Sequence, residues 1–367
     1  MINSLKSTLS RNITNARGWK TDCKIVVIES DDWGSIRMPS KEAVETLKMK
    51  GFKIDQCAYM QNDCLESNED MESLFDFLES RKKRPVLTAN FLTANPDFDK
   101  IKQSGFEQYY YESLGETLLN YPNHDRVKQL WLKGVSNQYF IPQLHGREHL
   151  NVKLWMKDLK EGNKETLDGF DLKLFGISAN TTKVLRPSYQ AAFGMDSGSY
   201  EHKERILSDA YEEFFNLFGF HSKTFIAPNY VWDEDIELIL SKLGVSHFQG
   251  SYAQTFYNHQ KNKNEIRRHH LGEKNKLNQK YLVRNVVFEP FSNPQIDWVS
   301  KSFKEINNAF FWNKPAIVSM HRVNFIGSIN PENRSHNLQL LDTLLNEIEK
   351  RWPEVEYMSS AELAKLI

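Results

Sequence analysis

Cysteine is scarce in this sequence. The 367 residues include three cysteines, Cys23, Cys57 and Cys64, an odd number without a Cys-x-x-Cys pair. This count excludes a disulfide framework or a zinc ribbon as the organising feature of the fold. We therefore expect a reducing compartment, the cytoplasm.

Long apolar runs are also absent. The longest purely aliphatic stretch is IVVI at 25–28, far shorter than the ~20 residues that a membrane-spanning helix needs. The amino-terminal residues lack the continuous apolar core of a signal peptide. They place Leu5, Leu9 and Ile13 at helical spacing, which predicts a helical extension over 1–22. We expect its apolar face to pack on the domain, with a peripheral membrane contact as the alternative.

Charge of one sign is not in excess. Lys and Arg number 47 against 48 Asp and Glu, so nothing in the overall charge points to a nucleic-acid partner. The hydrophobic share of 40% is that of a globular protein with a sizeable core. No repeat, Gly/Ser linker or low-complexity block marks a boundary, so we expect one domain over 1–367.

Short apolar runs alternate with amphipathic segments along the chain. The amphipathic segments include 41–51 and 233–244, each closed by a glycine, and 336–352. This alternation predicts parallel strands with crossover helices, hence an α/β sheet or barrel. Two stretches, 161–202 and 253–280, interrupt the pattern, and we expect long loops there that carry binding function. The predicted strands are 24–30, 85–92, 140–144, 224–228, 246–250, 281–289 and 316–321.

Residues able to bind a metal or move a proton follow three of these strands. Asp31 and Asp32 follow the first strand, His145 and His149 the third, and His321 the seventh. Each alone has an ordinary explanation, as a capping turn, a surface pair or a hydrogen-bonded core histidine. The carboxyl ends of parallel strands meet at one end of such folds, so together these residues favour a catalytic centre.

Asp32, His145 and His149 form a ligand set for a divalent metal. Two histidines four residues apart would lie on one face of a helix and point at one ion. An Asp and two His complete the protein ligands of many catalytic zinc sites and leave a position for water. The same ligand types bind iron in facial-triad oxygenases. We expect Zn²⁺, with Co²⁺, Ni²⁺, Mn²⁺ and Fe²⁺ as alternatives.

The order of these motifs resembles the polysaccharide deacetylase family, carbohydrate esterase family 4. ESDDW resembles its first motif, HGREH keeps the His-x-x-x-His spacing of its second, and FGFHSKTFIAPNYVWDEDIELILSKLGVSHFQG resembles the stretch around its third. FEPFSNPQIDWV is weakly like the fourth motif, and PAIVSMHRVN resembles the fifth. The resemblance covers most of 24–364, with 161–202 and 253–280 as insertions. It implies a single catalytic domain, a distorted (β/α) barrel of about seven parallel strands.

The resemblance also implies roles for individual residues. Asp32, His145 and His149 would bind the metal, Asp31 would be the general base, and His321 the general acid. The backbone N–H of Asn229 would stabilise the oxyanion. The remaining residues implied on the substrate side are Arg186, Tyr230 and Trp33.

Several positions depart from the family pattern. Ile226 stands where the third motif has an Arg that orients the base, and Asn229 replaces its Tyr. Gly146 and Leu150 stand where Ser or Thr and Pro are usual in the second motif. We expect Arg186 to orient the base instead; the alternatives are Arg284 and Arg322.

The resemblance implies a metal-dependent hydrolase that removes acetyl groups from N-acetylated, or O-acetylated, sugars of a poly- or oligosaccharide. An amidase acting on another small or cyclic amide, and an inactive glycan-binding relative, are the alternatives. Cationic side chains cluster at 258–281, and we expect them to contact an anionic glycan or its phosphate-bearing carrier. They are Lys261, Lys263, Arg267, Arg268, Lys274, Lys276 and Lys280.

Overall fold

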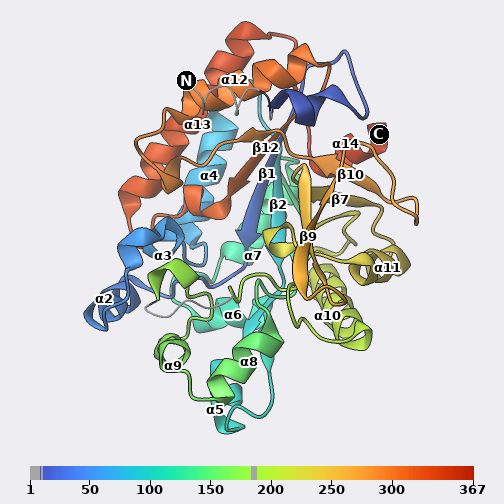
Figure 1. Cartoon of the computed structure of the whole chain (residues 1–367). Helices are drawn as coiled ribbons and strands as arrows, with labels where there is room; N and C mark the ends of the chain where they lie inside the picture. Colours follow the sequence, from blue (N-terminus) through green and yellow to red (C-terminus); the bar gives the residue numbers. More distant parts are fainter. Residues whose placement is uncertain (1–8, 10, 183–187) are drawn as a thin grey trace.

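The computed structural model describes residues 9, 11–182 and 188–367, and a curved parallel sheet lies at its centre (Figure 1). Its neighbouring strands, in spatial order, are β10 (Lys280–Val283), β7 (His247–Gly250), β6 (Thr224–Ile226), β5 (Phe140–Gly146), β2 (Leu87–Leu92), β1 (Ile25–Trp33), β12 (Ala316–His321) and β11 (Val286–Val287). The two-residue strand β13 (Glu356–Tyr357) also pairs with β1. The expected α/β fold, a distorted barrel of parallel strands, is confirmed.

Helices surround this barrel. Figure 1 shows α4, α12 and α13 to one side of the sheet and α10 and α11 to the other. The helices are α2 (Lys41–Met49), α3 (Ala58–Asn62), α4 (Asn68–Ser80), α5 (Phe98–Gln103), α6 (Leu114–Asn120), α7 (Val127–Ser136), α8 (Val152–Lys160), α9 (Lys164–Asp171), α10 (Tyr200–Phe218), α11 (Glu234–Lys242), α12 (Trp298–Phe311), α13 (Pro331–Arg351) and α14 (Ser360–Leu366). None of the helices in the described residues is long and apolar enough to span a bilayer.

The segments predicted as helices are helical, with shifted boundaries. Helices α2 and α11 both end just before glycines of positive φ, Gly51 at +86° and Gly244 at +85°, as the sequence indicates. Helix α13 begins earlier than the apolar pattern suggests, because Pro331 occupies its first turn, where no backbone N–H is needed.

The run 281–289 is two strands and not one, which corrects the sequence interpretation. Strand β10 lies at one edge of the sheet and β11 at the other, with two residues between them. The backbone N–H of Arg284 donates to the Gly250 carbonyl (2.8 Å), and that of Asn285 donates to the Ile317 carbonyl (3.2 Å). The sheet curves until its two edges approach each other. One apolar run can therefore form a strand at one edge and, two residues later, a strand at the other edge.

The barrel interior contains polar side chains. Glu29 is fully buried and accepts a hydrogen bond from the Ser360 hydroxyl (2.6 Å). The backbone N–H of Ser360 donates to the hydroxyl of Thr88 on β2 (2.8 Å). The first turn of α14 therefore caps the interior, and the apolar residues of the strands pack outward against the helices.

The described residues of the stretch 161–202, which was expected to be a long loop, pack against the rest of the domain. The stretch contains α9 and buries apolar side chains in two small clusters beside the barrel. Leu174 and Ile177 join the cluster around α2, whereas Phe170, Phe175 and Tyr189 join the cluster around α5 and α8. The expectation of a loop was wrong because these apolar residues follow no clear helical or strand periodicity. They are buried by contacts with residues that are distant in the sequence.

The stretch 253–280 contains an antiparallel hairpin, β8 (Ala253–Asn258) and β9 (Lys263–Arg268), where a loop was expected. The backbone N–H of Trp232 donates to the Thr255 carbonyl (3.1 Å), and this hydrogen bond joins the hairpin to the loop after β6. Glu234 and Glu265 form ion pairs with three of its cationic side chains: Lys261, Arg267 and Lys276. The contact with an anionic glycan stays a prediction.

The amino-terminal extension packs differently from the expectation. Residues 11–16 are helical, and Asn15 Nδ2 donates to Asn308 Oδ1 (2.9 Å). Leu9 and Ile13, expected to pack on the domain, are 62% and 45% exposed. Amide hydrogen bonds, and not an apolar face, hold the described part of this helix against α12; Leu5 lies outside the described residues.

Trp33 is a core residue, so its expected place beside the substrate is wrong. Its side chain is 1% exposed and packs edge-on against Phe140, with ring centroids 5.1 Å apart. Its indole N–H donates to the Ser30 hydroxyl (3.0 Å).

We predict that Trp33→Ala destabilises the protein by about 3–5 kcal/mol, because it removes a large buried ring from a packed aromatic cluster. Urea unfolding followed by circular dichroism measures this loss. Phe311→Ala is the control, because Phe311 is 75% exposed and its removal should change stability by about 0.5 kcal/mol or less. Equal stability losses in the two variants would contradict the core assignment.

Candidate metal centre and active site

A β-bulge at the carboxyl end of β1 turns two consecutive aspartates toward the same site. Ser30 pairs with Ala89 and Trp33 with Phe91, so that Asp31 and Asp32 together lie opposite Asn90 on β2. Asp32 has φ +73°, a conformation that is rare outside glycine. In a regular strand the two side chains would point to opposite faces. The bulge therefore gives both carboxylates to one end of the barrel.

Asp32, His145 and His149 converge on one point, as the sequence analysis expected of a ligand set. Asp32 Oδ1 lies 3.3 Å from His145 Nε2 and 3.5 Å from His149 Nε2. All three side chains are buried, and one ligand atom of each lies within 4.8 Å of the others. A tetrahedral zinc shell with bonds of about 2.0–2.1 Å has edges of about 3.3–3.4 Å. The separations therefore fit a cation bound between these atoms.

Hydrogen bonding also fits a cation at this point. His145 Nδ1 lies 2.9 Å from the Ile226 carbonyl oxygen, which can only accept, so Nδ1 carries the proton. In the neutral ring, Nε2 then presents a lone pair to Asp32 Oδ1. Two lone pairs facing each other in a buried site repel unless a proton or a metal ion lies between them.

His149 is poised as a neutral ligand. Burial lowers its pKa to about 3, although the Asp32 carboxylate opposes the shift, so the imidazole is neutral near pH 7. The two histidines do not share a helix face, which corrects the sequence interpretation. His145 lies in β5 and His149 in the turn before α8. Gly146, with φ +132°, makes this turn, in a conformation that strains other residues.

Arg37 holds the second oxygen of Asp32. Its guanidinium donates to Asp32 Oδ2 (2.8 Å), which leaves Oδ1 directed at the histidines. Electrostatic interactions with His149 and Arg37 outweigh burial and hold the pKa of Asp32 well below its usual range. Arg37 also lies 3.2 Å from Asp63, and Arg322 donates to Asp63 (2.9 Å) and Glu66 (2.6 Å). A buried network of ion pairs thus supports the carboxylate.

Asp31 is bound by Arg284, one of the two alternatives to Arg186. Arg284 donates through both terminal nitrogens to the two oxygens of Asp31, each at 2.7 Å, and through Nε to Glu29 (2.5 Å). Burial opposes ionisation of Asp31, but the Arg284 charge outweighs it and lowers the pKa to about 2. Arg322 binds elsewhere, in the Asp63 network, and Arg186 lies outside the described residues.

His321 faces Asp31 from the end of β12. Its Nε2 lies 4.0 Å from Asp31 Oδ2, and its Nδ1 forms a hydrogen bond of 2.6 Å with Glu289. Burial favours the neutral imidazole, but the Glu289 carboxylate outweighs it and raises the pKa of His321 to about 9. The imidazolium is therefore the main form near neutral pH. Asn324 donates to the other oxygen of Glu289 (2.9 Å) and fixes its orientation.

The buried groups at this end of the barrel carry a negative excess. Counted with every carboxylate ionised and His321 protonated, six carboxylates face four cationic groups, a formal excess of two negative charges at most, because burial raises the pKa of Glu29, Asp63 and Glu66. A divalent cation would balance them. The carboxylates are Glu29, Asp31, Asp32, Asp63, Glu66 and Glu289, and the cationic groups are Arg37, Arg284, Arg322 and His321.

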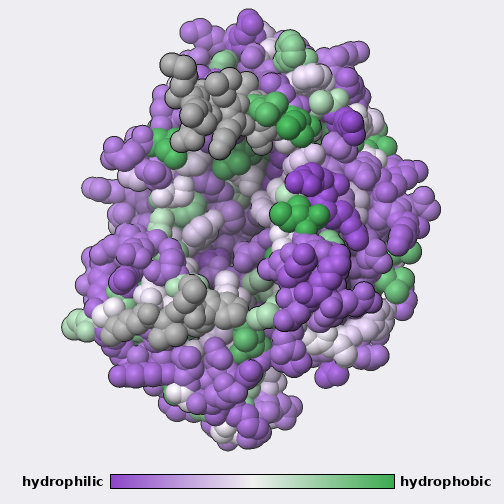
Figure 2. All heavy atoms as spheres, in the orientation of Figure 1, coloured by the Kyte–Doolittle hydropathy of each residue, from purple (hydrophilic) through white to green (hydrophobic). Residues whose placement is uncertain are grey.

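Asn229 and Tyr230 follow β6 at the rim of the site. Both have left-handed backbone conformations, with φ +56° and +55°. The Tyr230 hydroxyl accepts a hydrogen bond from Arg284 (2.9 Å), so Tyr230 contacts the residue that holds Asp31. Figure 2 shows the molecular surface hollowed near its centre, beside the hairpin β8–β9 and on the side of α3.

The sequence reasoning missed two residues of the site, Arg37 and Glu289. Arg37 lies in a loop with no motif around it, and only the fold brings it to Asp32. Glu289 follows an apolar run, and its place next to β12 depends on the crossing from β10 to β11. The sequence contains one indication that Arg284 belongs to the site: it is a cationic residue inside an apolar run.

We predict that the purified chain binds one divalent cation, and that Asp32→Asn and His149→Ala each abolish binding, because each removes one of three converging ligands. Elemental analysis after zinc loading and dialysis measures the metal per chain. His259→Ala, at an exposed histidine on the hairpin, is the control and should keep the full metal content. Retention of zinc by both ligand variants would rule out this centre.

Comparisons with known proteins give structural matches only. No family model matches the chain, and no curated protein matches its sequence. The CE4 domain of a multidomain xylanase from the hindgut metagenome of Trinervitermes trinervoides has a TM-score of 0.39 at 9% identity, over 94% of this chain and 90% of that one. The PuuE allantoinase has 0.41 at 9%, over 96% and 92%. A CE4 family pseudoenzyme from Bacillus anthracis has 0.36 at 9%, over 93% and 66%. These three proteins are described with different activities. The function of this chain must therefore be argued from its own side chains.

Proposed function

We propose that this protein is a metal-dependent hydrolase that removes acetyl groups from N-acetylated sugars of a poly- or oligosaccharide. One observation carries the proposal. Three ligand groups, Asp32, His145 and His149, surround one point beside an ionised carboxylate, Asp31, and a protonated imidazole, His321. Hydrolysis of an amide needs these three functions: an electrophile for the carbonyl, a proton acceptor for water and a proton donor for the leaving nitrogen.

The metal ligands and Asp31 act on the acyl side of the reaction. A divalent cation held there would polarise the acetyl carbonyl and make a nearby water molecule more acidic. Asp31 Oδ1 accepts hydrogen bonds from Asn90 and Arg284, whereas Oδ2 accepts from Arg284 alone among the described residues. Oδ2 thus keeps a lone pair on the side of His321 to orient the attacking water. Because the pKa of Asp31 is low, its carboxylate would hold the proton taken from water only briefly before passing it on.

His321 acts on the leaving group. An amide nitrogen leaves poorly unless it is protonated, and the Nε2–H of the imidazolium faces the space beside Asp31. Glu289 keeps the ring protonated and fixes its orientation through Nδ1. Within this proposal, the backbone N–H of Asn229 would stabilise the oxyanion.

The proposal predicts different losses for amide and ester substrates in His321→Ala. Turnover of N-acetylated oligosaccharides should fall by roughly 10²–10⁴-fold, the usual contribution of a positioned proton donor. O-acetylated sugars should lose less, because an alkoxide leaves with less help than an amide nitrogen. The metal content should not change, since His321 is not a ligand in the proposal.

Mass spectrometry of a panel of acetylated glycans after incubation with the zinc-loaded protein and with His321→Ala measures both rates. If the zinc-loaded protein removes acetyl groups from no member of the panel, the proposed function is wrong. If His321→Ala deacetylates the amides at the original rate, the role of His321 is wrong.

Glu289→Gln should change the pH dependence of the reaction. The folded-state pKa of His321 is raised to about 9, so the acid form is present below that pH and is lost as pH rises through it. Removal of the Glu289 charge should move this alkaline limb of kcat/KM to lower pH by about one unit or more. A pH–rate profile measures the shift, and Glu265→Gln on the hairpin, at another ion-paired carboxylate, should leave it in place.

A further inference from the structure

A second cavity, of about 610 Å³, lies next to the catalytic acid and has no role in the mechanism above. Three segments line it: the stretch 55–62 with α3, the turn η4 (Pro290–Ser292), and the first turns of α13. Pro290 directly follows Glu289, which holds His321. The Phe291 ring lies 4.7 Å from the Tyr59 ring, and the Tyr59 ring lies 5.3 Å from that of His321. One aromatic layer thus separates the cavity from the acid.

The lining of this cavity is rich in carboxamides. Six of its fourteen residues are Asn or Gln, and Ser292 and His336 add further polar groups. A carboxamide offers both donors and acceptors, which matches sugar hydroxyl and acetamido groups, since these also do both. Phe291, Pro290 and Pro294 supply apolar surface of the kind that the face of a sugar ring contacts. The six carboxamides are those of Gln56, Gln61, Asn62, Asn330, Asn333 and Asn337.

Several of these amides are already oriented. Gln61 Nε2 donates to the Asp55 carbonyl (3.3 Å), and Asn337 Nδ2 donates to Asn333 Oδ1 (3.1 Å). These bonds fix the planes of the amide groups, so their oxygens need little ordering to accept a hydrogen bond from a ligand. The cavity volume is within the range of small-molecule sites, about 300–1,000 Å³.

The charges of the lining select the ligand. Asp55 and Glu332 are its carboxylates, and no Lys or Arg is among the described residues that line it. Lys48 lies 3.4 Å from Asp55 but is not in the lining, so a sulfated or carboxylated sugar would meet the Glu332 charge without a cation in the cavity itself to bind it. A neutral sugar meets no such repulsion.

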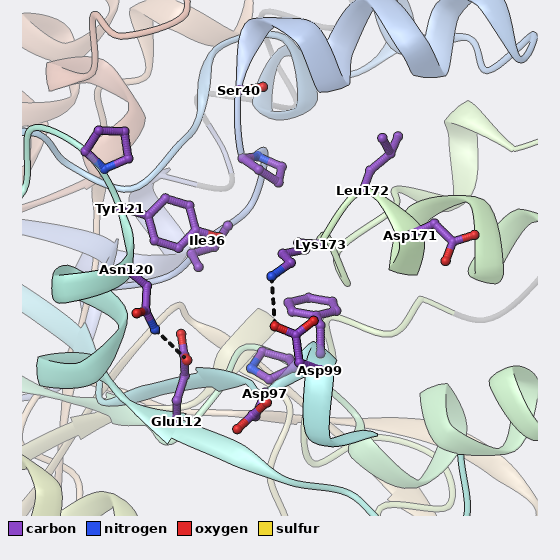
Figure 3. Close-up of a pocket in the computed structure, with 14 residues that line it drawn as sticks. Ile36, Ser40, Asp97, Asp99, Glu112, Asn120, Tyr121, Asp171, Leu172 and Lys173 are labelled. Atoms are coloured by element: carbon purple, nitrogen blue, oxygen red, sulfur yellow. Dashed lines mark hydrogen bonds and ion pairs between the residues drawn. The ribbon is translucent and has the colours of Figure 1, made fainter. Parts of the chain in front are cut away.

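A larger cavity, of about 730 Å³, has a different character (Figure 3). It has four carboxylates in its lining, and three of them already pair with lysines. Figure 3 shows Lys173 directed at Asp99 and Asn120 directed at Glu112. None of the side chains of the proposed metal centre, nor Asp31 or His321, lines either cavity, but the lining of the carboxamide-lined cavity includes Phe291, whose ring contacts lead through Tyr59 to His321. The carboxamide-lined cavity is therefore the one suited to an uncharged sugar beside the acid.

We infer that the carboxamide-lined cavity is a subsite for neutral N-acetylated sugars that lie beyond the immediate neighbour of the sugar that is deacetylated. The inference rests on the proposed function, because the sugar that carries the leaving nitrogen must lie on the side of His321. The chain of sugars continues past Tyr59 and Phe291 into the cavity. The enzyme then acts on oligosaccharides better than on their shortest members.

The test compares β-1,4-linked N-acetylglucosamine dimers and tetramers as substrates of the zinc-loaded protein. The variant is Gln56→Ala/Gln61→Ala/His336→Ala, whose three side chains line the cavity and are not fully buried. Wild type should have a kcat/KM on the order of tenfold higher for the tetramer than for the dimer. The triple variant should lose this gain and keep the dimer rate, because only the longer ligand reaches the cavity. Asn120→Ala, an amide in the other cavity, should behave as wild type.

Binding gives a second readout that does not need turnover. In an Asp31→Asn background, calorimetry with the tetramer should show affinity that the triple substitution weakens on the order of tenfold. If deacetylation occurs but the dimer and tetramer rates are equal, or if only Asn120→Ala removes the difference, the subsite inference is wrong and the proposed function stands. If no oligomer is deacetylated but the triple substitution weakens tetramer binding, the proposed function is wrong and the subsite inference stands. If neither turnover nor binding occurs, both are wrong.

Discussion

Uncompensated charge at the carboxyl end of the barrel is the constraint on which the rest of the site depends. Buried carboxylates cost several kcal/mol unless cations and hydrogen bonds compensate them. Arg37, Arg284 and Arg322 pair with most of them, yet the formal count over this end of the barrel, with every carboxylate ionised, leaves an excess of two negative charges. A divalent cation removes that excess and the repulsion between facing lone pairs. In the proposed function, the metal would therefore both stabilise the folded site and supply its chemistry.

Two backbone irregularities bring the charged groups together. The bulge in β1 turns Asp31 and Asp32 to the same side, which a regular strand does not allow. The break between β10 and β11 places Arg284 where the two edges of the sheet approach each other, so its side chain enters the barrel and binds Asp31 and Glu29. Arg284, an arginine from this break, thus binds the carboxylate for which the sequence predicted Arg186 as the partner.

Much of the fold could be predicted from the sequence, because apolar runs and glycine-terminated helices depend on local periodicity. The strands that carry Asp32, His145 and His321 were located within a few residues. The errors arose where distant contacts decide the structure. The run 281–289 divides between two sheet edges, and the stretch 161–202 folds onto side clusters that it does not form alone. Arg37 lies outside every motif and Glu289 lies in the weak match to the fourth, so the contacts of both depend on the fold.

X-ray absorption spectroscopy at the zinc edge tests the central claim most directly, namely that this end of the barrel is built around a divalent cation. On the zinc-loaded protein the account predicts a shell of nitrogen and oxygen ligands at about 2.0–2.1 Å, with the outer-shell scattering of two imidazole rings and no sulfur. Sulfur in the shell, or fewer than two imidazoles, would contradict the assignment of Asp32, His145 and His149 and the charge argument behind it.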